Sequence, residues 1–370
     1  MTAAAPAPAA PRHLDALTGI RGIAAWGVVL YHIRLSLTAI LPPQAIALFA
    51  KGYLAVDLFF ILSGFVIWYN YAARIERGGW SEARLFLWRR FARVWPLHGA
   101  ILLGFVGLAA MLLATGRDAS GYPLRELPLH LALVQNWGFT SQLTWNHPAW
   151  SISTEFAAYL LFPLFVVAAP WRRFPSWTLL MLAAMLALTL HALFALRGYS
   201  GLGEDIPGMG LWRCLAGFAM GCLMCQLWQR WKDHAHGGGL AALGCAAIIT
   251  GAWLARLPET AWVPAAFFAG LMALALGRGP VVRLLGGKAL TYLGEISYST
   301  YLAHFGLFIL FKLAFVDASL QLGWGGLAGF LALVMVASVG LYHGLEKPAQ
   351  RWLNARPPRW AERPRAVLAE

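Results

Sequence analysis

The stretch Thr18–Leu37, TGIRGIAAWGVVLYHIRLSL, is apolar enough to enter a bilayer, yet it contains Arg21 and His32. These two residues are eleven positions apart, so on a helix they share one face, roughly 16 Å apart along the axis. An ionisable side chain at membrane depth costs roughly 2.5–3.5 kcal/mol on insertion scales, so each residue needs a reason to be there. One interpretation is that Arg21 reaches to the membrane interface and His32 is a hydrogen-bonded core histidine. The alternative is a functional site that uses both.

The composition also indicates a membrane protein. Hydrophobic residues make up 59% of the 370 and charged residues only 12%, which excludes an ordinary soluble domain. The formal charge of +13 does not indicate a nucleic-acid partner, because the basic residues form short clusters between long apolar runs, as membrane loops do. Neither the four cysteines nor His234 and His236 have partners at metal-ligand spacing, so no metal is expected.

Ten apolar segments have the length of roughly 17–25 residues that a transmembrane helix needs. The predicted fold class is therefore an all-α polytopic membrane protein with about ten transmembrane helices. A moderately apolar piece at 124–137 is too short to cross, and it is predicted to form an interfacial or re-entrant helix. The predicted spans are 15–37, 52–72, 96–115, 149–169, 176–197, 210–229, 239–256, 261–277, 291–314 and 323–345.

The distribution of charge favours cytoplasmic N- and C-termini. Of the 29 lysines and arginines, 20 fall in segments that this topology places in the cytoplasm, and eight lie in or near outer loops. The sequence divides into a disordered Ala/Pro-rich tail at 1–12, one transmembrane domain at 13–350 and a basic cytoplasmic tail at 351–370.

Ionisable side chains from three predicted spans fall in one layer near the outer surface. His32 and Asp57 each lie about five residues below the outer end of their span, and Glu155 lies about six below its own. A carboxylate beside the imidazole would fix its tautomer and stabilise its protonated form, as for a general base and its orienting partner. A structural His–Asp hydrogen bond between two helices is the alternative. The clustering favours a function, because leucine would cost less at each position.

Arginines gather near the predicted cytoplasmic end. Arg21 opens the first span, and the loop WRRFARVWP adds Arg89, Arg90 and Arg93, of which the last two face the same way on a predicted helix. Guanidinium groups bind phosphates through paired hydrogen bonds, so this group predicts a site for a donor with a phosphate-bearing tail. The alternative is that these arginines only anchor the third span by the positive-inside rule.

Motifs along the chain follow the order and spacing of the acyltransferase-3 family, which this sequence resembles over roughly residues 13–350. These are integral-membrane O-acyltransferases that modify bacterial surface polysaccharides, peptidoglycan and some secreted metabolites. One departure is His98, which stands where a tyrosine is common. The motifs are Arg21-x10-His32, Asp57-Leu-Phe-Phe-Ile-Leu-Ser-Gly-Phe65, Arg90-x-x-Arg93 before Pro96, Trp150-Ser-Ile-Ser-x-Glu155, Ser297-Tyr-Ser-x-Tyr-Leu-x-His304 and Glu346-x-Pro348.

The resemblance implies a membrane-bound O-acyltransferase of the bacterial cytoplasmic (inner) membrane, surrounded by lipid. It would move an acyl group, expected to be acetyl, from cytoplasmic acyl-CoA to a hydroxyl of an extracytoplasmic glycan or lipid-linked sugar. Acyl-CoA is then a substrate, and no tightly bound cofactor is expected. The resemblance further implies that His32 is the essential histidine paired with Arg21, that Arg90 and Arg93 contact the donor, and that two acidic positions are occupied by Asp57 and Glu155.

The predicted mechanism is direct acyl transfer, with His32 as general base, Asp57 orienting its ring and Glu155 positioning the acceptor. A transient acyl-histidine is the alternative chemistry. Two non-enzymatic hypotheses also remain, a proton-coupled transporter or flippase of an anionic or lipid-linked solute, and a structural helper in a glycan-assembly complex. Further candidates for acceptor or oxyanion contacts are Ser63, Trp150, Ser153, Tyr298 and His304.

Overall fold

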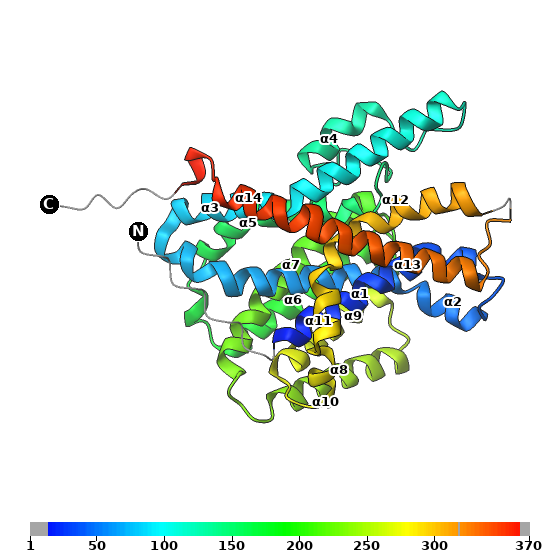
Figure 1. The fold of residues 1–370 in the computed structure, drawn as a ribbon. Coiled ribbons are helices and arrows are strands. Elements are labelled where there is room, and N and C mark those ends of the chain that lie inside the picture. The colour runs from blue at the N-terminus through cyan, green and yellow to red at the C-terminus, as the bar shows by residue number, and fades with distance from the viewer. Residues whose placement is uncertain (1–13, 317–318, 363–370) are drawn as a thin grey trace.

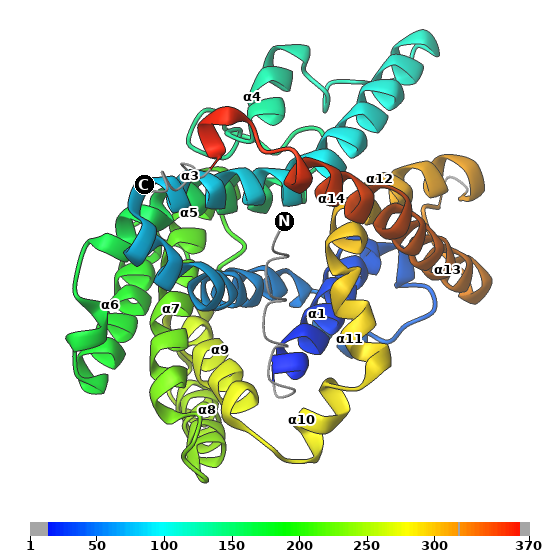
Figure 2. The same ribbon diagram turned by 60° about the vertical axis from the view of Figure 1, so that its left-hand side comes forward.

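The computed structural model describes residues 14–316 and 319–362, and the predicted tail at 1–12 lies outside these ranges. Over the described residues the chain is helical and contains no strand. Figures 1 and 2 show the long helices gathered into one bundle, with the shorter ones around it. The α-helices are α1 Asp15–Ile33, α2 Pro43–Phe49, α3 Ala55–Ala114, α4 Leu127–Ala132, α5 Ala149–Val167, α6 Ser176–Ala195, α7 Ile206–Trp231, α8 Gly237–Leu254, α9 Glu259–Leu276, α10 Pro280–Leu285, α11 Lys288–Glu295, α12 Ser297–Phe315, α13 Trp324–Leu341 and α14 Lys347–Ala355.

Several of these helices are long and apolar enough to cross a bilayer, as a polytopic membrane protein requires. Among the described residues, nine helical segments meet that requirement by length and composition. One of them, Pro43–Ala114, is 72 residues long and covers two of the ten predicted spans. The all-helical, membrane-compatible fold therefore agrees with the sequence analysis, whereas the number of crossings and the side of each terminus stay predictions.

Two helix boundaries differ from the predicted spans. The predicted cytoplasmic loop at 73–95 is largely helical and belongs to α3, which consists of two helices that meet at a kink at Gly79, where φ is 55° and ψ is −137°. Glycine adopts this left-handed backbone without the steric cost of a side chain. The predicted span 291–314 is instead broken between α11 and α12. Here the Ser297 hydroxyl donates to the carbonyl of Gly294 at 2.7 Å, a local bond that competes with a continuous helix.

The first part of α3 packs against α7 at the centre of the bundle. A Cβ atom on Gly64 would lie 1.9 Å from the carbonyl oxygen of Phe218, and one on Gly221 would lie 1.9 Å from that of Ile61. Glycines at both places let the two backbones touch, as small residues do in membrane helix pairs. This contact aligns α3 and α7 in the same direction, so polar side chains at matching positions of the two helices can meet.

The connection between α3 and α5 forms a cap on the bundle, and of the helix predicted at 124–137 only residues 124–132 are helical. Only a short 3-10 turn and the six-residue α4 are regular, and α4 ends at Leu133, whose φ is 59°. The Trp137 indole donates to the carbonyl of Ser153 at 2.8 Å, and the backbone N–H of Asn136 donates to the Ser153 hydroxyl at 3.1 Å. Ser153, predicted as an acceptor contact, therefore holds the cap on α5.

The C-terminal segment packs along α3. α13 continues through a π-helical turn, Tyr342–Glu346, into α14, and the Trp88 indole donates to the carbonyl of Leu353 at 3.0 Å. The predicted tail at 351–370 thus begins inside α14, and its residues 363–370 lie outside the described ranges.

Candidate functional site

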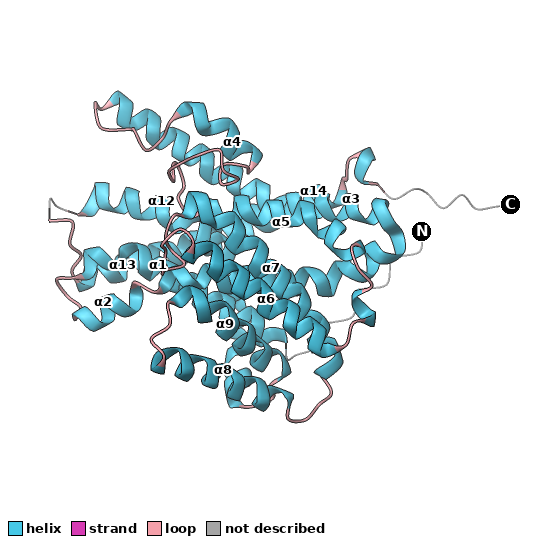
Figure 3. Cartoon of the chain, turned by 180° about the vertical axis from the view of Figure 1, so that it is seen from behind, coloured by secondary structure: helices cyan, strands magenta, loops and turns pink. Residues whose placement is uncertain are grey.

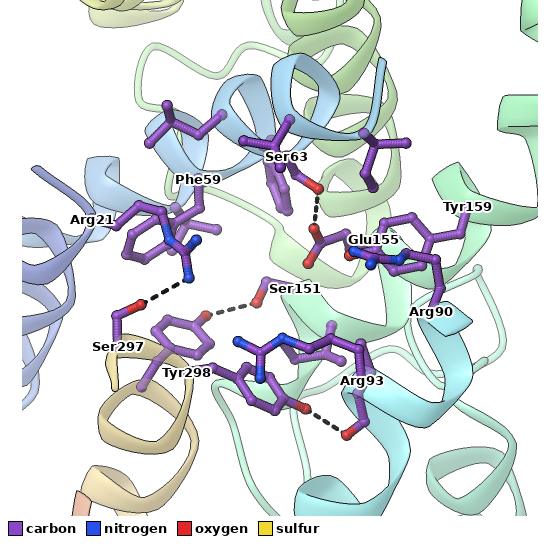
Figure 4. A pocket seen from close by; sticks show the side chains of 18 residues that line it. Arg21, Phe59, Ser63, Arg90, Arg93, Ser151, Glu155, Tyr159, Ser297 and Tyr298 are labelled. Atoms are coloured by element: carbon purple, nitrogen blue, oxygen red, sulfur yellow. Dashed lines mark hydrogen bonds between the residues drawn. The ribbon is translucent and has the colours of Figure 1, made fainter. Parts of the chain in front are cut away.

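Arginines from α1 and α3 line a cavity of about 160 Å³ between α1, α3, α5 and α12. Arg21, Arg90 and Arg93 all point toward it, as Figure 4 shows, whereas Arg89 is not among its lining residues. We call this the arginine cavity. The convergence expected from the sequence is therefore present for three of the four arginines.

The three guanidinium groups differ in their partners. Arg21 Nη2 donates to Ser297 Oγ at 3.1 Å, and Arg90 Nη2 donates to the Tyr71 hydroxyl at 3.1 Å. Arg93 forms an ion pair with Glu346, which lies behind the cavity. Within the described chain, neither Arg21 nor Arg90 forms an ion pair with a carboxylate. These two cations thus lack a paired carboxylate among the described residues, although Glu155 lines the same cavity.

Glu155 lies in the arginine cavity, where its carboxylate accepts a hydrogen bond from the Ser63 hydroxyl (Figure 4). The prediction of one layer shared with His32 is therefore corrected, because His32 lines a different cavity. A carboxylate in a low-dielectric interior is more stable beside guanidinium cations than beside a neutral imidazole. The Ser63 hydroxyl, predicted as an oxyanion contact, therefore donates its proton to the Glu155 carboxylate.

His32 lines a second cavity of about 220 Å³, the histidine cavity, and its ring contacts that of His304. His32 Nδ1 lies 3.0 Å from the carbonyl oxygen of Val28 and 3.1 Å from His304 Nε2. His304 Nδ1 lies 3.2 Å from the carbonyl oxygen of Thr300. Since a carbonyl only accepts, both Nδ1 atoms carry protons, and the Nδ1–H of His32 is shared between the Val28 carbonyl and His304 Nε2. The hydrogen bonds therefore leave His32 Nε2 with a free lone pair, as a general base requires.

Asp57 does not orient the His32 ring as predicted. Its two carboxylate oxygens accept from Arg213, at 3.1 Å from Nε and 2.6 Å from Nη2, and both residues are buried. The Arg213 guanidinium also lies over the Trp150 ring, 5.3 Å from its centroid. A two-point bond to a cation satisfies a buried carboxylate better than a neutral imidazole does. The expected His32–Asp57 pair is thus replaced by the pairs Asp57–Arg213 and His32–His304.

The arginine and histidine cavities are neighbours. Val56 and Tyr301 line both of them. The Tyr301 hydroxyl donates to the carbonyl of Pro148 at 3.1 Å and lies 2.7 Å from Ser151 Oγ, so the ring is fixed in the shared wall. A ligand whose charged part occupied the arginine cavity would therefore have its other end next to His32.

A sequence profile described as an acyltransferase domain, Acyl_transf_3, matches residues 14–343. This chain belongs to the acyltransferase-3 family. It is 31% identical over 376 aligned positions to the acyltransferase MdmB of Streptomyces mycarofaciens, covering 93% of this chain and 94% of MdmB. It is 23% identical over 371 positions to the O-acetyltransferase OatA of Staphylococcus aureus, covering 92% of this chain but only 58% of OatA. No solved structure matches.

In this acyltransferase a third, much smaller cavity of about 10 Å³ adjoins the histidine cavity through Leu143, His147 and Trp150. Its lining includes three buried atoms that have no hydrogen-bond partner among the described residues, Gln135 Oε1, Asn146 Oδ1 and His130 Nδ1. The two amide oxygens only accept hydrogen bonds, and His130 Nδ1 is unprotonated because Nε2 carries the proton of this ring. The cavity has room for about one water, and it is complementary to a group that donates hydrogen bonds.

The tautomer of His130 follows from its neighbours. Its Nε2 lies 3.0 Å from Thr144 Oγ1, and this hydroxyl donates to the Glu126 carboxylate at 2.9 Å. The hydroxyl proton is thus already used, so Nε2 must donate to Thr144, which leaves Nδ1 unprotonated.

We expect the cap formed by 124–148 to loosen in mild acid. Burial, with smaller contributions from the nearby His98 and His147, lowers the pKa of His130 to about 4. Because this folded-state pKa lies below the ordinary 6.5, the unfolded cap binds more protons, so stability is lost as pH falls from about 6.5 toward 4. Amide hydrogen exchange of the cap, corrected for intrinsic rates, should be faster at pH 5 than at pH 7.

Two variants control this experiment. His130→Asn should make exchange of the cap less dependent on pH, whereas His236→Asn, at an exposed histidine after α7, should leave the dependence unchanged. Equal protection at pH 5 and pH 7 in the unmodified protein would contradict the expectation.

The buried partner that the sequence analysis missed most clearly is Arg213. It lies inside the predicted span 210–229, and an arginine within an apolar span is itself a signal of a buried partner. Tyr298 was selected, but its hydroxyl donates to the carbonyl of Val94 at 2.7 Å, so its proton is already used. Among the described residues, no three His, Cys, Asp or Glu side chains converge as metal ligands.

Proposed function

We propose that this acyltransferase moves an acyl group from cytoplasmic acyl-CoA to a hydroxyl of a carbohydrate or similar acceptor on the outer side of the bacterial cytoplasmic membrane. The observation that carries the proposal is the pair of adjoining cavities, one lined by guanidinium groups and one by the imidazole of His32. Acetyl is the proposed acyl group, because one relative is named an O-acetyltransferase.

The donor would enter with its phosphates in the arginine cavity. Arg21 and Arg90 supply cations that lack a carboxylate partner in the described chain, and guanidinium groups bind phosphate oxygens through paired hydrogen bonds. Arg93 is already bound to Glu346 and would act mainly through its charge. The thioester end would lie beyond Tyr301, next to His32.

His32 Nε2 would take the proton from the acceptor hydroxyl as its oxygen attacks the thioester carbonyl. The oxygen–carbon bond of the ester forms, the carbon–sulfur bond breaks, and the proton passes from His32 to the leaving thiolate of CoA. In this direct transfer His304 accepts the hydrogen bond of His32 Nδ1 and keeps the tautomer, the role that the sequence analysis gave to Asp57. Asp57 would act only through Arg213.

The small cavity beside Trp150 supports a hydroxylated acceptor. Its acceptors without donors, Gln135 Oε1, Asn146 Oδ1 and His130 Nδ1, would be satisfied by hydroxyl groups, and an aromatic ring such as that of Trp150 offers a face for a sugar. Because the cavity is narrow, only one edge of such an acceptor would enter it without movement of the cap.

The role of His304 can be tested with two substitutions. His304→Ala should lower the rate of acyl transfer roughly 10–100-fold, by analogy with the partners that orient metal-bound histidines. His304→Gln, which retains an acceptor oxygen, should recover part of the loss. The pH–rate profile should shift in His304→Ala, because the basicity of His32 changes. A rate loss with an unchanged profile would instead indicate a purely structural role.

The proposed function itself is tested with purified protein in vesicles, supplied with isotopically labelled acetyl-CoA and an extract of surface glycans. We expect release of CoA thiol and an added acetyl mass on the glycan by mass spectrometry, neither of which occurs with His32→Ala. Movement of a solute without any thiol release or acetylated product would favour a transporter. Comparison of glycans from cells with and without the gene should then identify the acceptor.

A further inference from the structure

A large apolar cavity lies between α6 and α8, with α7 and α9 beneath it. Its volume is about 700 Å³, and it shares no lining residue with the arginine or histidine cavity. We call it the α6–α8 groove. Figure 3 shows α8 at the edge of the bundle, and only 11% of the residues of this helix are buried. Small side chains leave the space open, namely Ala183, Ala184, Ala187, Ala241, Gly244, Ala265 and Ala269.

Polar side chains line this groove only at one end. There the connection between α7 and α8 contributes His234 and His236, next to the indole of Trp231. Every other lining residue is apolar or glycine. The groove therefore suits a long apolar chain with a polar group at one end, and it does not suit a soluble, highly charged ligand such as acyl-CoA.

The polar end carries an excess of basic side chains. Lys232 follows Trp231, and Arg278 Nη2 donates to the carbonyl of Lys232 at 3.4 Å, so these two residues lie beside the mouth. Arg230 instead donates to Ser176 Oγ and to the carbonyls of Trp171 and Arg172. Asp233 is the acidic residue of this connection, but in the part of the chain that the structure describes neither Lys232 nor Arg278 forms an ion pair with a carboxylate. The mouth is thus complementary to an anion.

The length of the groove matches one leaflet. Along α8 it extends from Gly237 to Ile248, a separation of eleven positions or roughly 16 Å of helix. Half of a hydrocarbon core of about 30 Å is roughly 15 Å, so a chain that starts at the mouth would end near the bilayer midplane. The mouth lies at the end predicted to be cytoplasmic, where anionic lipids attract basic residues.

We propose that the α6–α8 groove binds an anionic glycerophospholipid of this leaflet, with its phosphate at Lys232 and Arg278 and one acyl chain between α6 and α8. The site is independent of acyl transfer. The bound lipid would hold α8 against α6, whereas in the protein alone α8 packs mainly against α9.

Native mass spectrometry of the detergent-purified full chain tests the site. The protein is incubated with phosphatidylglycerol or with phosphatidylcholine of the same chains, and the bound fraction is measured. We expect phosphatidylglycerol to be retained preferentially. In Gly244→Leu about nine-tenths of that binding should be lost, because a Cβ there meets nothing within 4 Å and the new side chain enters the groove. Gly251→Leu, equally open on the same helix but outside the lining, should bind as before.

Two arginine variants test the proposal independently of the groove variant Gly244→Leu. Arg278→Gln should weaken phosphatidylglycerol binding about fivefold, whereas Arg283→Gln, at an exposed arginine of α10, should not. Equal retention of the two lipids, or equal binding by the two arginine variants, would overturn the proposal. Should Gly244→Leu fail to elute as a folded protein in size-exclusion chromatography, the arginine pair still gives the answer.

Discussion

Replacing His32 with alanine is expected to lower the rate of acyl transfer by about 10²–10⁴, the usual contribution of a general base. The hydrogen bonds to Val28 and His304 keep its proton on Nδ1, so Nε2 is the nitrogen that the reaction would lose. Release of CoA thiol by the purified protein in vesicles measures the effect on kcat. The KM for acyl-CoA should change little, because the donor phosphates are proposed to bind to arginines in the neighbouring cavity.

A matched control is His191→Ala, another histidine within a helix, whose Nδ1 lies 2.9 Å from Thr260 Oγ1. It should keep most of the activity. Added imidazole should partly restore His32→Ala, since the histidine cavity of about 220 Å³ gains the space of the lost ring. Full transfer by His32→Ala without imidazole would exclude His32 both as a base and as a covalent acyl carrier.

The helices could be predicted because each apolar run has the length of a span, but their continuity could not. The polar segment at 73–95 reads as a loop, and Gly78 and Gly79 strengthen that interpretation. In the structure two helices meet at a kink at Gly79, and the second of them runs through the arginines into the next apolar run. Local polarity therefore indicated which side chains face water or ligand, without determining whether the backbone is helical.

The site could be predicted in part, because charged residues inside apolar runs are few. Arg21, Arg90 and Arg93 meet as their positions suggested. Depth counted from span ends placed Glu155 beside His32, but depth does not give the rotation of a helix about its axis. Rotation is set by packing, and the buried partners that it selects, here Ser63 for Glu155, follow only from three-dimensional contacts.

The pairing of Asp57 with Arg213 illustrates the same limit. Asp57 lies inside a predicted span, so it was expected to need a partner, whereas Arg213 was counted with the basic residues in or near outer loops. Their meeting depends on α3 and α7 touching at Gly64 and Gly221, a contact that the two apolar patterns do not specify. From the depth of each residue in its span alone, the imidazole of His32 was the nearest partner for Asp57.

Breaking this buried ion pair should be the most destabilising change among the polar residues of the bundle. Asp57→Asn or Arg213→Met is expected to cost about 3–5 kcal/mol, because each leaves one buried charge uncompensated. The double variant Asp57→Leu/Arg213→Met should recover most of that loss, since apolar side chains of similar size need no partner. Glu76→Gln, which removes the half-exposed ion pair with Arg172, should cost less than about 1 kcal/mol. Denaturant unfolding in detergent, followed by tryptophan fluorescence, measures all four.

The activity of the folded double variant then separates two roles for Asp57. If the pair only joins α3 to α7, thiol release from acyl-CoA should stay within about tenfold of the unmodified protein once both charges are gone. If the Asp57 carboxylate contributes to proton transfer at His32, the loss should approach that of His32→Ala although the fold is restored. Because Arg213 takes both oxygens of Asp57 and His304 takes the hydrogen bond of His32, we expect the first result. A double variant as unstable as the single ones would show that the pair contributes net stability beyond the apolar replacement.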